Sequence, residues 1–335
     1  MSALINLKKQ IIKFIFENFR SRVEGKKMLG YTFGELGSIV AMQGFAGLIL
    51  FSVFVLMGLG LAIIFGQLGV INMAHGEFMM IGMYITYVVQ MLFIEFAPAS
   101  FMNFYFFVAM GVAFLFTAVM GGCVEFLVIR HLYKRPLDTL LATWGISLIL
   151  QQSIRVVFGT REVGVVKPDW MMGSVAVTDM IDIQIYGLVV MTITIILTAL
   201  VIYLMLRSVW GKHVRAVVQN REMAGAVGIN TALTDRMTFG VGCGIAGIAG
   251  SAFTMISSTA PDAGQHYIVD TFLVVVFGGA GSLLGTVASA FAISQTQSTL
   301  EFFITGSMAK VWTLLIVIGI LMVRPQGLFA VKIRR

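Results

Sequence analysis

Long apolar runs, separated by short charged or polar segments, make up most of this chain. Within the runs, polar residues do not alternate with apolar ones at every second position. A helix needs about twenty apolar residues to cross the hydrocarbon core of a bilayer, whereas a strand of a membrane barrel needs about ten residues that alternate. The pattern therefore predicts membrane-embedded helices over roughly 38–66, 77–97, 104–129, 137–158, 185–207, 237–258, 267–278, 285–302 and 309–323.

Composition agrees with this pattern. Hydrophobic residues are 58% of the 335 residues and charged residues only 12%, and the mean hydropathy is +0.93. Ordinary soluble domains carry about 25% charged residues. Backbone polar groups in a bilayer must be satisfied within the protein, which leaves helices as the structure for such runs. We expect an all-α polytopic membrane protein.

Basic residues indicate which segments face the cytoplasm. Lys and Arg concentrate in four segments that hold 19 of the 23 basic residues: 1–37, 130–135, 207–236 and 324–335. Basic segments next to membrane helices stay in the cytoplasm, so we expect both chain termini there. Residues 159–184 contain more acidic than basic residues, and we expect them to form an external loop.

The same distribution divides the chain into regions. Residues 1–37 are too basic, and too long before the first apolar run, to be a cleavable signal. We expect them to remain as a basic cytoplasmic segment, for which an in-plane amphipathic helix is one possible form. The transmembrane domain is then 38–323, with a cytoplasmic segment at 208–236 and a cytoplasmic tail at 324–335.

The stretch 36–76 has 41 residues without Asp, Glu, Lys or Arg, about twice the length of one span. If residue 37 and Arg130 are both cytoplasmic, an even number of crossings must separate them. We therefore expect the stretch to break near the glycines at 58–60 into a full span and a shorter helix that ends near Gly69. The whole chain would have about 8–10 transmembrane elements.

A weak internal repeat accompanies this expected break. "FGQLG" at 65–69 recurs as "FGGAG" at 277–281, and each closes an apolar run before a turn into another one. Paired glycine-broken helices in the two halves of a bundle are typical of inverted repeats with a transport site between them. Glycines that only allow helices to pack closely are the alternative.

Common enzyme motifs are absent from the sequence. It has no G-x-x-x-x-G-K-[ST], no H-E-x-x-H and no G-x-S-x-G, which are the motifs of P-loop ATPases, zinc metalloproteases and serine hydrolases. The two cysteines, Cys123 and Cys243, lie inside apolar runs and suggest neither a disulfide nor a metal site. We expect a non-catalytic chain that binds neither ATP nor a metal ion.

The cytoplasmic segment 208–236 differs from a short connecting loop. Its centre, "REMAGAVGI" at 221–229, can form a short helix with a face of small residues. Such a face admits close contact with another protein, so the segment has the character of a docking element. A solvated connector between two helices is the alternative.

Glu77 follows a long stretch that carries no full charge. An unpaired charge at the bilayer centre costs about 2.5 to 3.5 kcal/mol on insertion scales, so this side chain must face protein, water or an interface. With Asn72 and His75 it could cap the helix that begins there and satisfy free backbone groups. Direct contact with a permeating solute and proton coupling are the alternatives.

A second polar group lies on the expected span at 137–158. Its members recur at every fourth position and stay within an arc of about 120° on an α-helix: Thr139, Thr143, Ser147 and Gln151. With Trp144 beside them, they would suit the path of a small uncharged solute that both donates and accepts hydrogen bonds. Hydrogen bonding between helices is the alternative.

Several separated motifs carry a family resemblance. "EMAGAVG" at 222–228 is accompanied by "GVINMAHGEFMMIG" at 69–82, "RPLDTLLATWGISLILQQSIRVVFG" at 135–159 and "VRPQGLF" at 323–329. Together they resemble the branched-chain amino acid permease family of ATP-binding cassette (ABC) importers, whose coupling signature has alanine where Met223 stands. "TLLATWGISLILQQ" and "YIVDTFLVVVFGGAGSLLGT" at 267–286 are most similar to the first permease subunit of urea or short-chain amide importers.

The resemblance implies partners and roles. It implies a second related permease, two ATPase subunits that carry ATP and Mg²⁺, and an external solute-binding protein, all at a bacterial cytoplasmic membrane and without nucleic acid. It also implies that 38–323 is a transmembrane permease domain and that 208–236 is its coupling segment. This segment would contain a coupling helix that docks on an ATPase and includes Arg221, Glu222, Met223, Ala224, Gly225 and Gly228. A branched-chain amino acid as solute, and a urea channel or secondary transporter without an ATPase, are the alternatives.

Overall fold

The computed structural model describes residues 33–133, 135–178, 181–279 and 281–329. This part of the chain is mainly helical and confirms the all-α polytopic prediction. Its eight helices of 18 residues or more are α2 (Phe33–Ile63), α3 (His75–Phe96), α4 (Tyr105–Leu127), α5 (Pro136–Phe158), α6 (Ile185–Arg207), α9 (Thr231–Phe253), α11 (Leu283–Phe303) and α12 (Gly306–Val323).

Shorter elements connect these helices. The short α-helices are α7 (Val209–Gln219), α8 (Arg221–Ala226) and α10 (Ala263–Gly278). The 3₁₀ turns are η3 (Ala99–Phe104), η4 (Ile129–His131) and η5 (Asp169–Met171), and η2 (Ile64–Leu68) is a π-helical turn that continues α2. An antiparallel hairpin of β1 (Ser174–Thr178) and β2 (Ile181–Gln184) precedes α6.

Within the described residues, six helical segments are long and apolar enough to cross a membrane. They comprise α2 with η2, α3, α4 with its flanking turns, α5, α6 and α12. Helices α9 and α11 have similar lengths but contain more small and polar residues. With α10, the described bundle therefore has nine helices of at least 16 residues, within the range expected from the sequence.

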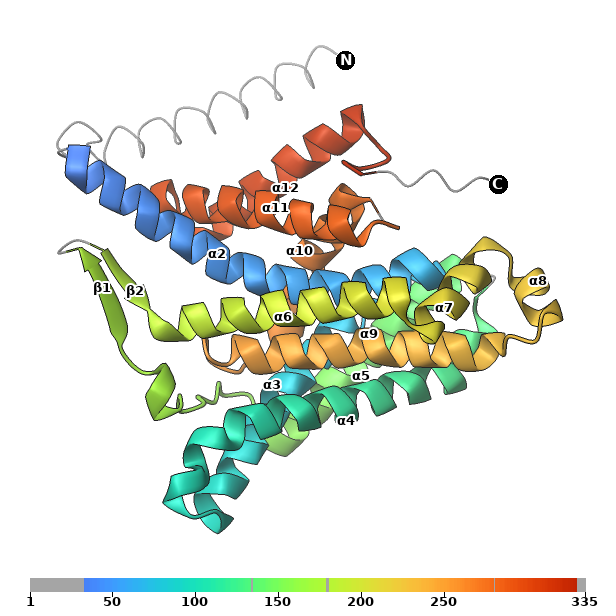
Figure 1. Ribbon diagram of the computed structural model, residues 1–335, viewed down its shortest axis with the longest axis horizontal. Helices are drawn as coiled ribbons and strands as arrows, with labels where there is room; N and C mark the ends of the chain where they lie inside the picture. Colours follow the sequence, from blue (N-terminus) through green and yellow to red (C-terminus); the bar gives the residue numbers. More distant parts are fainter. Residues whose placement is uncertain (1–32, 134, 179–180, 280, 330–335) are drawn as a thin grey trace, which may run out of the picture.

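The hairpin and the coupling segment lie at opposite ends of the bundle (Figure 1). Helix α6 begins at the hairpin and ends at α7, and α8 follows at the end that the hairpin does not occupy. The acidic loop and the basic coupling segment are thus separated by the length of the bundle, as the charge distribution requires. We call these two ends the hairpin end and the coupling end.

Helix α2 does not break at the glycines 58–60. It runs without interruption into η2 and stops at Gly69, whose φ of 67° is left-handed. A Cβ at Gly60 would lie 2.6 Å from the carbonyl oxygen of Gly242, and the close neighbours of Gly58 are Val274 and Thr286. The expected break is therefore wrong, because these glycines admit neighbouring helices, whereas the expected helix end near Gly69 is confirmed.

A continuous α2 changes where the first span begins. Ala41 and Met42 line a groove together with residues 181–184 of the hairpin, so α2 starts at the hairpin end and reaches the coupling end after one crossing (Figure 1). The expectation that residue 37 and Arg130 share one side is therefore wrong. Residues 1–32 and 330–335, with the expected in-plane helix and both chain termini, lie outside the described residues.

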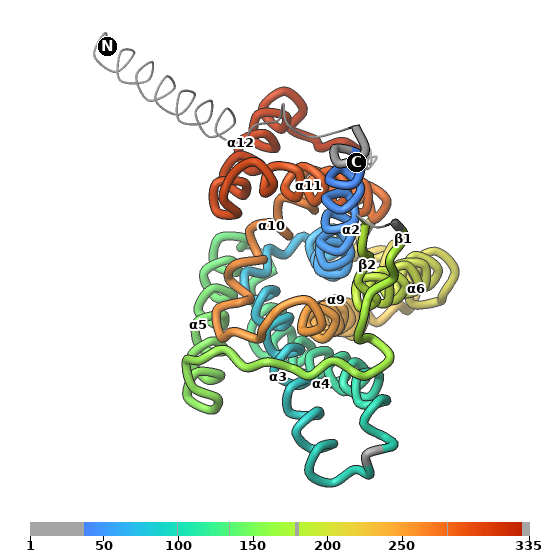
Figure 2. The backbone as a smooth tube through the Cα atoms, turned by 90° about the vertical axis from the view of Figure 1, so that its left-hand side faces the viewer, coloured from blue at the N-terminus to red at the C-terminus, as the bar shows by residue number. Residues whose placement is uncertain are grey.

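Helix α9 occupies the centre of the bundle, with α2, α3 and α4 around it (Figure 2). Glycines allow these helices to approach one another closely. A Cβ at Gly82 of α3 would lie 2.7 Å from the carbonyl carbon of Gly247 in α9, and one at Gly250 would lie 2.9 Å from the carbonyl carbon of Met79. Helices α3 and α9 are therefore in backbone contact over at least one turn.

Candidate functional site

Helix α5 faces the bundle with polar side chains. The most buried residues of this helix are also its stripe of regularly spaced polar positions, which are between 0% and 4% exposed: Thr139, Thr143, Ser147 and Gln151. Many apolar residues of α5 point outward instead. This side of α5 therefore contacts the bundle through hydrogen bonds as well as through apolar neighbours such as Ile146 and Leu150. We call the four residues the α5 polar stripe.

The first half of the α5 polar stripe contacts backbone groups. The Thr139 hydroxyl lies 2.9 Å from the carbonyl oxygen of Leu132 and 3.0 Å from that of Arg135. The Thr143 hydroxyl oxygen accepts the backbone N–H of Met73 at 3.1 Å. Met73 belongs to the non-helical turn 69–74 that separates η2 from α3. The stripe thus holds this turn in place.

The second half of the stripe contacts side chains of two other helices. The Ser147 hydroxyl donates to Oε1 of Glu77 in α3 at 3.0 Å. Nε2 of Gln265 in α10 donates to Oε1 of Gln151 at 3.4 Å. The stripe therefore meets the turn before α3, then α3, then α10, in an order that runs from the coupling end toward the hairpin end.

Glu77 is 1% exposed and lies in the first turn of α3. The N-cap of α3 is Ala74, and it makes no side-chain capping bond. Among the described residues, the Glu77 oxygen Oε2 has no hydrogen-bond partner. The only hydrogen bond of this carboxyl group is thus directed to α5, and it does not cap the helix by a hydrogen bond to a free backbone N–H.

His75 and Asn72 hold the start of α3. Nε2 of His75 lies 3.1 Å from the carbonyl oxygen of Met57 in α2, and the ring is fully buried. The Asn72 oxygen Oδ1 accepts the N–H of Ala74 at 3.1 Å. Of the three residues expected to cap α3, Asn72 therefore satisfies a free backbone group. His75 ties α3 to α2 instead, and the expected capping hydrogen bond of Glu77 is not formed.

Trp144 does not join the α5 polar stripe. Its side chain is 52% exposed, because successive residues of an α-helix are rotated by about 100°. The stripe, Glu77 and Asn72 are therefore grouped around the contact of α3 with α5, and Trp144 lies on a different face of α5.

Three buried side chains around this contact each carry an unpartnered polar atom. Within the described residues, Nδ2 of Asn72, Oε2 of Glu77 and Nε2 of Gln151 have no hydrogen-bond partner. Burial of an unpaired polar group costs roughly 1–3 kcal/mol in proteins. The three atoms comprise two donors and one acceptor, which a water molecule or a small solute with both functions can satisfy.

Helix α8 presents a second candidate site at the coupling end (Figure 1). Asn220 caps it, with Oδ1 accepting the N–H of Met223 at 3.0 Å. Glu222, Met223 and Gly225 are exposed, whereas Ala224 is buried against the bundle. A Cβ at Gly225 would have no neighbour within 4 Å, so nothing in the described chain requires a small residue there.

Gly228 ends this helix. Its φ is 88°, a left-handed conformation that glycine adopts without the steric cost other residues carry. The N–H of Gly228 donates to the carbonyl of Gly225, and the N–H of Ile229 donates to that of Ala224, both at 3.0 Å. The turn returns the chain to α9 and leaves the outer face of α8 open.

Comparison with known proteins gives the family of this chain. The model of the family described as "Branched-chain amino acid transport system / permease component" matches residues 44–324. The chain belongs to this family. As a permease of an ABC importer, it works with ATPase and solute-binding partners.

Individual relatives agree with the family assignment. The permease is 26% identical over 295 residues to the "High-affinity branched-chain amino acid transport system permease protein LivH" of Salmonella typhimurium, covering 85% of this chain and 94% of the relative. It is 24% identical over 314 residues to the "Probable branched-chain amino acid transport permease protein LivH" of Methanocaldococcus jannaschii, covering 89% and 94%. No solved structure matches.

A more distant relative matches less of the permease. The "Fructose import permease protein FrcC" of Rhizobium meliloti is 31% identical over 147 residues, which is 41% of this chain and 38% of the relative. The relatives that cover most of the permease are 23% to 26% identical to it. The family is therefore established, and the urea branch of the family is not.

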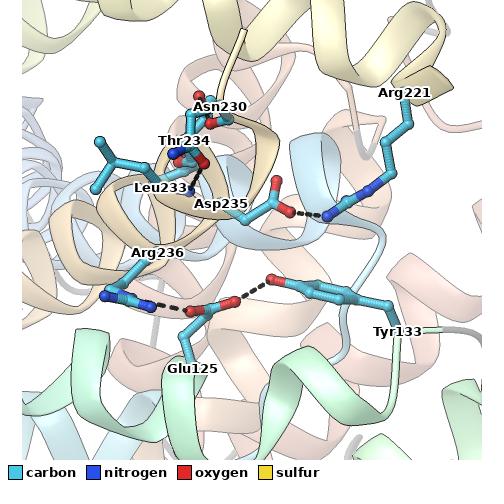
Figure 3. Close-up of polar contacts among 9 residues, drawn as sticks. Glu125, Tyr133, Arg221, Asn230, Leu233, Thr234, Asp235 and Arg236 are labelled. Carbon is cyan, nitrogen blue, oxygen red and sulfur yellow. Dashed lines mark hydrogen bonds and ion pairs between the residues drawn. The ribbon is translucent and has the colours of Figure 1, made fainter. Parts of the chain in front are cut away.

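The structure adds two buried carboxylates to the coupling end of the permease. Asp235 in the second turn of α9 pairs with Arg221 of α8, and Glu125 near the end of α4 pairs with Arg236 (Figure 3). Sequence reasoning did not single out either acid. Glu125 carried a signal, since it is a charged residue within the apolar run 104–129, where ionisable residues are rare.

Proposed function

We propose that this chain is a permease subunit of an ATP-driven importer that moves urea or a short-chain amide into the cytoplasm. It would act with a second related permease, two ATPase subunits and an external solute-binding protein in the bacterial cytoplasmic membrane. The α5 polar stripe and its contact with Glu77 are the observation that carries the choice of solute class.

The chemistry of the stripe suits a small uncharged solute. Hydroxyl and amide side chains both donate and accept hydrogen bonds, as urea and short amides do. The unpartnered Oε2 of Glu77 would accept an N–H of the solute, and Nε2 of Gln151 would donate to its carbonyl oxygen. The four residues of the stripe carry no full charge that would hold such a solute too strongly.

The stripe is closed in the conformation described above. Its residues, with Glu77 and Asn72, are all 4% exposed or less, so helices must move before a solute can pass. The hydrogen bonds that close the stripe join α5 to α3 and α10. Separation of these helices would exchange the bonds between helices for bonds to the solute at little net cost.

ATP on the partner subunits would supply the movement. The exposed face of α8 formed by Glu222, Met223 and Gly225 would lie in a groove of an ATPase subunit. Gly228 would form the turn by which the chain leaves α8 toward α9. Closure of the ATPase pair on ATP and Mg²⁺ would displace α8 and change the access of the stripe from one side of the membrane to the other. The chain itself would catalyse no reaction.

A branched-chain amino acid is the second candidate solute. The relatives that cover most of the chain are named for branched-chain amino acid transport. A groove of about 520 Å³ at the hairpin end has mainly apolar lining residues, among them Phe45, Ile49, Tyr186, Phe253 and Tyr267. Such a groove could hold an aliphatic side chain.

Uptake into vesicles that carry the whole assembly tests the proposal. Labelled urea, acetamide and leucine would be supplied outside with the binding protein, and ATP would be enclosed or omitted. ATP-dependent entry of urea or acetamide without leucine is the expected result. Entry of leucine instead would assign the amino acid as the solute. Entry of urea without ATP would overturn the importer in favour of a channel.

A further inference from the structure

A chain of polar contacts joins the coupling helix to two membrane helices (Figure 3). Arg221 of α8 is ion-paired with Asp235 of α9 at 2.5 Å. Arg236, the next residue of α9, is ion-paired with Glu125 of α4 at 3.6 Å. Tyr133, in the connection between α4 and α5, donates its hydroxyl proton to Oε1 of Glu125 at 2.9 Å.

Tyr133 closes these contacts into one network. Its ring lies 5.3 Å from the guanidinium carbon of Arg221, within the range of a cation–π interaction. Burial, followed by the nearby carboxylates of Asp235 and Glu125, raises the pKa of Tyr133 above its ordinary value. The hydroxyl group therefore remains protonated and keeps donating to Glu125 at neutral pH.

The acids and the bases of the network differ in burial. Asp235 is 1% exposed and Glu125 is 2% exposed, whereas Arg221 is 49% exposed and Arg236 is 40% exposed. Two buried carboxylates thus belong to the membrane helices, and the cations approach from the surface. A buried carboxylate holds its partner strongly, because loss of the cation leaves an uncompensated charge.

Few other buried groups attach α8 to the bundle. Ala224 is the one buried residue among the six of this helix, and the other five are exposed. Asp235, in contrast, lies next to the capped start of α9, where the Asn230 oxygen Oδ1 accepts the N–H of Leu233 at 3.0 Å. The pair of Arg221 with Asp235 therefore joins a weakly attached helix to a firmly anchored one.

Helix α9 leads from this network to the candidate path. It is in backbone contact with α3 at Gly82 and Gly250, as described above. Helix α3 carries Glu77, whose carboxylate meets Ser147 of the α5 polar stripe. A displacement of the start of α9 would therefore reach Glu77 through close-packed helices.

We infer that Asp235, Glu125 and Tyr133 are positioning residues that transmit the displacement of α8 to α9 and α4. This inference rests on the proposed function, because it requires an ATPase that moves α8. In this scheme Arg221 contacts two partners at once. Its exposed side meets the ATPase, and its guanidinium group is ion-paired with the buried carboxylate of Asp235. Asp235, Glu125 and Tyr133 make solute movement depend on ATP hydrolysis, and these three residues are not needed for ATPase binding.

The test measures ATP hydrolysis and solute uptake together in vesicles with the complete assembly. Asp235→Asn and Tyr133→Phe would each be compared with wild type and with Asp138→Asn. Asp138 is a matched control, because it is a carboxylate at the coupling end that pairs with Arg135 at 3.5 Å on an exposed surface. The expected result is unchanged ATPase co-purification and a fall of about tenfold in solute moved per ATP hydrolysed, a size typical of changes within a coupled network.

A second variant separates coupling from folding. Glu125→Gln combined with Arg236→Gln removes both charges of a pair that lies outside α8. It leaves no buried carboxylate unpaired, so this double variant should assemble as wild type does. It should also lose solute movement per ATP. Wild-type coupling in this double variant, or in both single variants, would overturn the inference. Absence of ATP-driven uptake in the wild-type assembly would instead overturn the proposed function.

Discussion

The contact of α3 with α9 predicts a large effect of one added methyl group at Gly82. A Cβ there would lie 2.7 Å from both the carbonyl carbon and the Cα of Gly247, which is roughly 1 Å closer than an optimal contact between carbon atoms. Both neighbours are backbone atoms, so no side chain can rotate away. Gly82→Ala therefore requires the two helices to separate.

The expected magnitude follows from two opposing effects. Overpacking of a close-packed interior costs about 1–3 kcal/mol, and more where backbone must move. Replacement of glycine by alanine inside a helix returns about 1 kcal/mol of helix propensity. Gly145→Ala in α5 is the matched control, since a Cβ there has no neighbour within 4 Å, and it should be neutral or stabilising.

Thermal unfolding of the purified permease in detergent, followed by loss of the monodisperse peak on gel filtration, measures this difference. Gly82→Ala should unfold at a clearly lower temperature than wild type, and Gly145→Ala at the same or a higher temperature. The backbone contact of α3 with α9 would be refuted if both variants unfolded at the same temperature. The proposed transmission from α9 to Glu77 would then lose its route.

Two further predictions concern the candidate sites. Gly225→Leu should leave thermal unfolding unchanged, because its surroundings within the chain are open, but should abolish co-purification of the ATPase; retained co-purification would show that this face of α8 is not the docking face. Ser147→Ala should lower stability by about 0.6–1.7 kcal/mol, the size of hydrogen bonds between membrane helices, and should change solute uptake. Ser153→Ala, on an exposed part of α5 with its hydroxyl bonded to the Ile149 carbonyl, should alter neither quantity, and equal behaviour of the two serine variants would contradict the role of the stripe.

Much of the fold could be predicted because the bilayer restricts what a long apolar run can become. The helical class and the end of the α2 helix at Gly69 followed from this restriction and from a glycine at a helix end. The spacing of the α5 polar stripe was also enough to predict that its four residues share one face of the helix, because a period of four places residues on one face whatever surrounds the helix. These features depend only on residues close in sequence.

Features that depend on distant residues could not be predicted. Gly58 and Gly60 look like a helix break in the sequence, and only the positions of Val274, Thr286 and Gly242 show that they admit other helices. The expected break itself followed from the expectation that residue 37 and Arg130 share one side, because that expectation requires an even number of crossings between them. The pairing of Arg221 with Asp235, across the turn after α8, likewise has no periodic signal.

The central claim is that ATP on the partner subunits drives solute uptake by moving α8. Measurement of solute uptake with α8 intact and with α8 altered tests this claim most directly. Vesicles with the whole assembly would be compared, with and without enclosed ATP, for the wild type and for the double variant Glu222→Ala with Gly228→Ala. The account predicts that wild-type uptake of the solute requires ATP, and that the double variant loses both uptake and the co-purifying ATPase. Uptake without ATP in the wild type, or full uptake in the double variant, would contradict it.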